Sequence, residues 1–119
     1  MSRRAERGAA TAELALTLPL LVAMTVGLAW LLAVGAAQVR AVDAARETAR
    51  ALARGDQEQA AVARGVRVAP DGSTVRVRWV GDEVRVTVTG RVPGPGGIFG
   101  RLPAPEVHAE AVAVSELVR

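Results

Sequence analysis

The longest apolar stretch of the chain runs from Leu14 to Ala37 without a charged residue. About 20 apolar residues are enough to cross the hydrocarbon core of a bilayer, so this stretch predicts a transmembrane helix. Pro19 removes a backbone hydrogen bond in its first third, and we expect a kink or loosening there that a side chain such as Thr17 offsets. Ala23 and Gly27 form a small-residue pair, four residues apart, that offers a close-packing surface to another helix.

The helical pattern continues beyond the apolar stretch. Gln38–Arg54 is rich in Ala, Arg and Glu, which favour helix, and Gly55 is a suitable residue to end it. We expect a second, short helix that begins at Asp56, with Gln59 three residues later completing a capping box. Gly65 is expected to end this second helix.

After residue 65 the hydrophobic period changes from helical to two, which predicts strands. A two-residue turn at Gly81-Asp82 places apolar residues opposite one another, whereas a three-residue loop would place valines opposite arginines. The resulting cross-strand pairs are Trp79 with Val84, Val77 with Val86, and Val75 with Val88. The same register places Arg78 opposite Arg85, an unfavourable pair that Glu83 or a carboxylate on a neighbouring strand would offset.

The remaining segments complete an α+β fold. Pro70–Ser73 predicts a turn, Pro93–Gly97 predicts a loop, and residues 106–117 alternate as a last strand. We therefore expect an N-terminal transmembrane helix that continues into a long helix, followed by a small antiparallel sheet of three to four strands packed on that helix. The expected organisation is a basic leader at 1–8, the transmembrane helix at 9–37, an extracytoplasmic helical region at 38–64 and a small antiparallel β-domain at 65–119.

The residue that most clearly indicates a function is Glu13, which lies at the edge of the apolar stretch. A carboxylate is costly in hydrocarbon, so we expect it to have a function and a partner. Gly8 lies five residues earlier, after a basic run. A cut after Gly8 would make Ala9 the new amino terminus, and its amine and the Glu13 carboxylate could neutralise each other within one chain or between neighbours. The simpler interpretation of Glu13 is a residue that starts a helix and complements its dipole.

Composition and charge narrow the function classes. The hydrophobic fraction of 50 % comes mostly from Ala, Val and Leu, and Trp30, Trp79 and Phe99 are the only aromatic residues, so we expect a thin core of Val and Ala. All 15 basic residues are Arg, and the net charge is +3. Loss of residues 1–8 would leave 12 basic and 11 acidic residues, which gives no support to nucleic-acid binding.

Candidate catalytic residues are few. There is no Cys, which excludes disulfides and thiolate metal sites, and metal-ligand spacing is absent. His108 is the only histidine and lies in an expected strand, while Ser2, Ser73 and Ser115 have no base beside them in the pattern. We expect no enzymatic activity, no cofactor, no metal and no small-molecule substrate.

The apolar stretch has a rival interpretation as a secretory signal peptide cleaved after Ala37. A signal peptide has an apolar region of about 7–15 residues, which is shorter than this one, so a retained anchor is favoured. Arginines flank the stretch on both sides, so the positive-inside rule does not clearly favour either orientation in the membrane. The short basic N-terminus favours a cytoplasmic N-terminus and an extracytoplasmic C-terminal domain.

Gly8, four intervening residues, Glu13 and a long apolar helix resemble the processing signal of type IV prepilins. The string RGAATAELALTLPLL resembles the TadE-like family of Tad (tight adherence) pilus minor pilins, and the resemblance extends through QVRAVDAARETARALARG and VRVTVTGRVPGP. It implies that a prepilin peptidase cleaves between Gly8 and Ala9 on the cytoplasmic side, with Glu13 as the acidic residue of the mature terminus. Many members are longer or carry cysteines, which this chain lacks.

Three hypotheses follow from these observations. The leading one is a minor pilin or pseudopilin that joins or primes a surface filament with other pilin subunits and the Tad assembly machinery, which comprises a major pilin, an assembly ATPase and inner-membrane platform proteins. The second is an uncleaved single-pass anchor in the lipid bilayer whose β-module binds an envelope partner. The third is a secreted domain released after Ala37. Intact mass separates them, because they predict loss of residues 1–8, no loss, and loss of residues 1–37.

Overall fold

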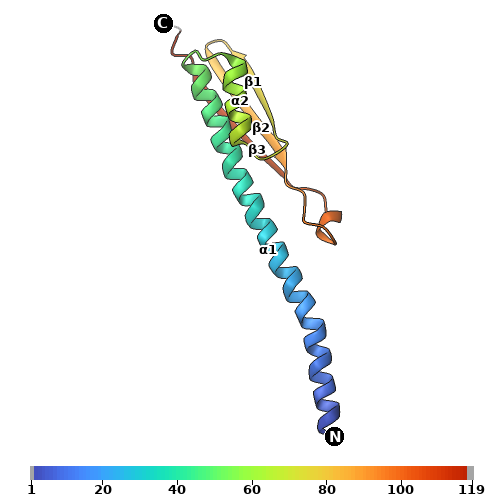
Figure 1. Cartoon of the computed structure of the whole chain (residues 1–119). Coiled ribbons are helices and arrows are strands. Elements are labelled where there is room, and N and C mark those ends of the chain that lie inside the picture. The colour runs from blue at the N-terminus through green and yellow to red at the C-terminus, as the bar shows by residue number, and fades with distance from the viewer. Residues whose placement is uncertain (1, 118–119) are drawn as a thin grey trace. The chain divides into compact units, whose positions relative to one another are not determined.

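The computed structural model describes residues 2–117 (Figure 1). Its elements are helix α1 (Arg3–Ala53), helix α2 (Glu58–Val68), strands β1 (Thr74–Val80) and β2 (Glu83–Arg91), the short 3-10 helix η1 (Phe99–Arg101) and strand β3 (Glu106–Val114). The chain divides into two compact units, one up to Leu32 and one from Ala33 onward, so the boundary falls inside α1. The predicted α+β fold is confirmed, and the sheet has three strands.

The first unit contains the charged start of α1 and most of its apolar stretch. By length and composition α1 is able to cross a membrane, with a mean hydropathy of 2.2 in its apolar window. Its large side chains are exposed, Leu16 and Leu32 each to 77 %. The helix continues through Pro19. Pro19 has no amide hydrogen, so the Ala15 carbonyl lacks its usual donor. The Thr17 hydroxyl does not replace that donor, because it donates to the Glu13 carbonyl oxygen at 2.6 Å.

The sheet of the second unit is antiparallel, in the order β1-β2-β3, and its register is the predicted one. Gly81 has a φ of 63°, and Asp82 does not share a positive φ, as a type II′ turn requires. Arg78 lies opposite Arg85, as expected. The Arg85 guanidinium pairs with Glu83 of its own strand at 3.1 Å and with Glu110 of β3 at 3.3 Å, so two carboxylates offset the repulsion.

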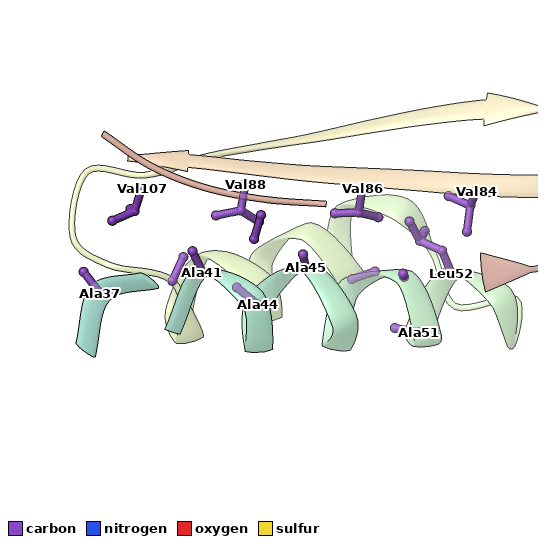
Figure 2. Close-up of a cluster of buried hydrophobic side chains, with 14 residues drawn as sticks. Ala37, Ala41, Ala44, Ala45, Ala51, Leu52, Val84, Val86, Val88 and Val107 are labelled. Atoms are coloured by element: carbon purple, nitrogen blue, oxygen red, sulfur yellow. The ribbon is translucent and has the colours of Figure 1, made fainter. Parts of the chain in front are cut away.

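The core of the second unit is thin and consists of Ala and Val. One face of the sheet lies on the C-terminal part of α1, where Ala37, Ala41 and Ala45 face the valines of the strands (Figure 2). Alanine is small, so the valine side chains fill most of the space between the helix and the sheet. The completely buried residues of this unit include Ala41, Ala44 and Ala45 of α1 and Val84, Val86 and Val88 of β2.

Helix α1 ends as the sequence predicted. Gly55 has a φ of 94°, in the left-handed region that favours glycine. The Gly55 amide donates to the carbonyl of Leu52, and the Asp56 amide donates to the carbonyl of Ala51, both at 3.0 Å. These two bonds form a Schellman motif, which satisfies carbonyls that the end of the helix would otherwise leave without donors.

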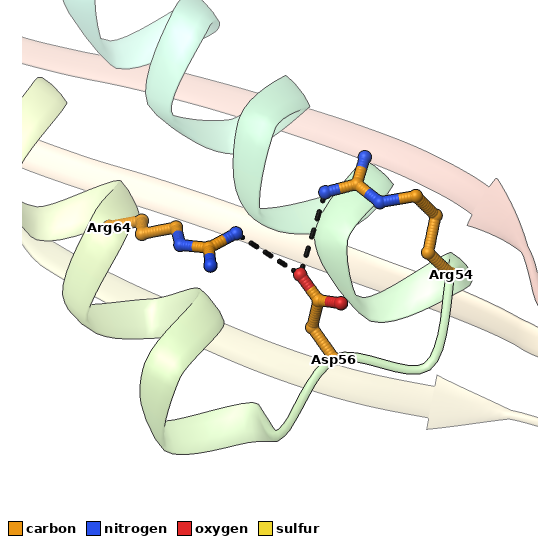
Figure 3. Close-up of polar contacts among 3 residues, drawn as sticks. All are labelled: Arg54, Asp56 and Arg64. Carbon is orange, nitrogen blue, oxygen red and sulfur yellow. Dashed lines mark hydrogen bonds and ion pairs between the residues drawn. The ribbon is translucent and has the colours of Figure 1, made fainter.

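The prediction that Asp56 caps the second helix was wrong. The N-cap residue of α2 is Gln57, and its side chain makes no capping hydrogen bond. The Asp56 carboxylate instead accepts from Arg54 at 3.5 Å and from Arg64 at 3.1 Å (Figure 3). The carboxylate therefore makes charge-assisted contacts with two guanidinium groups and does not accept from the amides at the start of α2.

The prediction that Gly65 ends the second helix was also wrong, because α2 continues to Val68. Gly65 is buried where α2 packs against α1. A Cβ atom at this position would overlap the hydroxyl of Thr48, which is itself completely buried and donates to the Ala44 carbonyl at 2.8 Å. The glycine therefore permits a close approach of two helices and does not terminate one.

Candidate processing site

The residues of the candidate processing site all lie near the start of α1. Gly8, Ala9 and Glu13 are helical and exposed. Residues four apart in an α-helix lie on the same face, one turn from each other. Ala9 and Glu13 have this spacing, so the helix places the Glu13 side chain on the same face as the residue whose amine a cut after Gly8 would free.

Gly8 has no structural reason to be glycine. Its backbone does not have a positive φ, and apart from the adjoining backbone of its own helix no atom lies within 4 Å of where a Cβ would stand. Glycine in a helix interior costs about 0.5–1 kcal/mol relative to alanine. Alanine at position 8 would therefore leave the stability of the helix unchanged or slightly higher. If processing nevertheless requires glycine there, the requirement must come from recognition by another molecule.

Among residues 2–117, none of the ion pairs involves the Glu13 carboxylate. Its backbone carbonyl accepts from Thr17, one turn further along, and the side chain is exposed. The carboxylate is therefore available for a partner that the uncut chain does not provide.

Ala23 and Gly27 lie one turn apart on α1, and both are half-buried against their own helix. Their spacing presents a narrow strip of small residues on the apolar helix. Close packing of another helix on this strip stays a prediction.

The polar groups considered for catalysis lie apart. His108 is exposed on β3, and the hydroxyls of Ser2 and Ser115 accept from nearby backbone amides of their own segments. The Ser73 hydroxyl is buried beside Gly90 and has no hydrogen-bond partner among the described residues. In the same part of the chain, no group of three or more His, Cys, Asp or Glu side chains is placed to hold a metal ion.

Comparison with known protein families found a match that covers the candidate site. The family model described as TadE-like protein matches residues 8–50. The match begins at Gly8 and includes Glu13, the whole apolar stretch and most of the helix that packs on the sheet. It confirms the resemblance over these residues and does not extend to the strands. Searches among curated proteins and among solved structures found no match.

Proposed function

We propose that this chain, which matches the TadE-like family over residues 8–50, is a minor pilin or pseudopilin of a Tad-type type IV pilus. The family suggests a pilin-like protein associated with the Tad pilus, with a structural and not an enzymatic role. The observation that carries the proposal is Gly8 and Glu13, exposed at the start of an apolar helix that is able to cross a membrane.

In this proposal the chain is the substrate of a prepilin peptidase, which cleaves between Gly8 and Ala9 at the cytoplasmic side of the membrane. In the uncut chain this peptide bond lies within α1, so the enzyme must bind it after the helix has opened locally. Helix ends open easily, and a glycine weakens the helix further at this point. The open space beside Gly8, where the fold does not require a glycine, supports a role for this residue in recognition by the peptidase.

The cut places two opposite charges one turn apart. The new amine of Ala9 adds a positive charge to the positive end of the helix dipole, and Glu13 neutralises it from the next turn. An unpaired carboxylate at the boundary of hydrocarbon is costly, so the pair lowers the free energy of both groups. The spacing supports pairing within one chain in the membrane, and a neighbouring subunit offers the same chemistry after assembly.

Assembly then moves the apolar helix from the lipid bilayer into contact with other subunits. The exposed leucines of the first unit need lipid before assembly and other pilin subunits in the filament, with Ala23 and Gly27 as a close-packing strip. The proposed orientation is single-pass, with the N-terminus in the cytoplasm and the second unit outside it. The partners are the lipid bilayer, the prepilin peptidase, other pilin subunits and the Tad assembly machinery.

The test compares Glu13→Gln with Glu6→Gln in cells that express the full assembly system. Glu6 is a matched control, because it is also an exposed glutamate of α1 but belongs to the leader. We expect both variants to lose residues 1–8 and to fold. Only Glu13→Gln should fail to copurify with sheared filaments or with the assembly machinery. Equal copurification of the two variants would refute the pairing role.

Intact mass of the same membrane-extracted samples tests the processing step separately. An unprocessed chain would favour a single-pass anchor that displays its β-module to an envelope partner. Loss of residues 1–37 would instead show that the apolar stretch is a signal peptide, and the pilin proposal would then fail.

A further inference from the structure

Two hydrogen-bonded contacts set the direction of β3 within the second unit. The Gln38 amide donates to the His108 carbonyl at 2.7 Å and accepts from the His108 amide at 3.2 Å. At the other end of the strand, the Glu116 amide donates to the carbonyl of Ala53 at 2.9 Å. Strand β3 therefore runs in the same direction as this part of α1.

This direction places the connection between β2 and β3 at one particular end of the unit. The connection, residues 92–105, lies at the end where the chain leaves the apolar stretch, since Gln38 directly follows its last residue, Ala37. Figure 1 shows it projecting past the ends of the strands, with η1 at its tip. If α1 spans a bilayer, Ala37 lies near the membrane surface, and so does this loop.

The loop is closed at its base and folded on itself. The Val92 amide donates to the Pro105 carbonyl at 3.1 Å, and the Arg91 guanidinium donates to the Ala104 carbonyl at 3.3 Å. Gly94 lies so close to the backbone of Phe99 that a Cβ atom would overlap it. The loop is therefore largely ordered before it meets any partner, which lowers the entropy cost of binding.

The tip carries two large apolar side chains that the fold does not cover. Ile98 is 68 % exposed and Leu102 is 51 % exposed, and the exposed Arg101 lies between them in sequence. The pattern of apolar and basic residues is the one that binds the interface of a bilayer, where apolar groups enter the acyl boundary and basic groups meet the phosphates.

We propose that the tip of this loop inserts Ile98 and Leu102 into the bilayer surface beside the membrane span of its own chain. Arg101 then lies at the level of the lipid phosphates. The occupant is lipid because the fold holds the tip at the level where the charge-free stretch ends, so the bilayer is present at a high effective concentration. This contact would fix the second unit against the membrane before assembly. The inference rests on the membrane-spanning role of α1 in the proposed function.

The chain has no cysteine, so single nitroxide labels report on single sites. The full chain carries Ile98→Cys, Leu102→Cys, Leu21→Cys in the apolar stretch, or Asp82→Cys in the β1–β2 turn at the opposite end of the unit. Each labelled protein is placed in phosphatidylcholine–phosphatidylglycerol vesicles. Collision rates with oxygen, which partitions into lipid, and with a water-soluble nickel chelate then give the depth of each label.

We expect labels at 98 and 102 to have an oxygen-to-nickel collision ratio several-fold above that at 82 and below that at 21. Equal ratios at 98 and 82, with 21 in the bilayer, would overturn the loop proposal and leave the pilin proposal intact. Low collision rates with both agents at 98 would also overturn it, since they would show that protein covers the tip. If the label at 21 is also in water, the membrane premise fails, and the proposed function fails with it.

Discussion

Replacing Gly65 by Ala tests the close approach of α2 to α1 in the second unit. A Cβ atom at this position would overlap the Thr48 hydroxyl, while its other neighbours, the Thr48 Cβ and the Ala44 carbonyl oxygen, lie at 3.5 Å, an ordinary contact distance. One atom therefore accounts for the whole conflict. Thr48 is completely buried, so its side chain has little room to move away.

The expected cost is the difference between two effects. Overpacking of a buried site costs about 1–3 kcal/mol. Alanine regains about 0.5–1 kcal/mol over glycine in a helix interior. We expect Gly65→Ala to lower the free energy of unfolding by about 1–2 kcal/mol, which is roughly a 5- to 30-fold fall in the folded-to-unfolded ratio.

Hydrogen exchange of the β2 amides in the full chain, in micelles, measures this change at the strand that forms the core. Thr48→Ala removes the hydroxyl and should relieve most of the cost of Gly65→Ala, whereas Thr48→Ser keeps the hydroxyl and should not. The coupling free energy between Gly65→Ala and Thr48→Ala should be about 1 kcal/mol or more. Unchanged protection of the β2 amides in Gly65→Ala would refute this explanation. So would an equal effect of Thr48→Ala and Thr48→Ser on the cost of Gly65→Ala.

Three further substitutions test other parts of the second unit by the same exchange measurement. Gln38→Ala removes two hydrogen bonds to His108 and should cost about 1–2 kcal/mol, with the fastest new exchange at the His108 amide; unchanged exchange there would contradict the contact. Gly55→Ala should cost about 1–3 kcal/mol, because alanine is strained at a φ of 94° and its Cβ would overlap Leu117; a neutral effect would contradict the helix end described here. Val86→Ala leaves a cavity at a completely buried site and should cost about 2–3 kcal/mol; a loss below about 1 kcal/mol would show a core that collapses around the gap.

The β-hairpin could be predicted from the sequence because side chains in a strand alternate with a period of two. A shift of one residue would have turned every valine of β2 away from the helix, so the buried face and the turn at Gly81 specified one register. The end of α1 at Gly55 was predictable for a similar reason, since a helix end is a local structure with a strong glycine preference.

The second helix was harder to predict because tertiary contacts override its local signals. Asp56 has the local pattern of a cap, but Arg54 and Arg64 hold its carboxylate. Gly65 has the local pattern of a helix end, but its small size serves the contact with Thr48. Thr48 lies 17 residues before Gly65, and nothing in the local pattern shows that Asp56 turns to the arginines and away from the helix amides.

The candidate site was found from the sequence, because Gly8, Glu13 and the apolar stretch follow one another directly. The structure added that Ala9 and Glu13 share one helix face and that nothing in the fold requires a glycine at position 8. The loop tip at Ile98 and Leu102 was missed, since its proposed position near the membrane depends on the contact between Gln38 and His108, which are far apart in sequence. Two large apolar residues in a loop rich in Pro and Gly were the available signal.

The mass of the mature protein tests whether this chain is a processed pilin-like subunit. The measurement is intact mass, with N-terminal sequencing, of the full chain extracted from membranes of cells that contain a prepilin peptidase. A processed subunit should lack residues 1–8 and begin at Ala9. A chain that keeps its leader, or one that begins after Ala37, would contradict it.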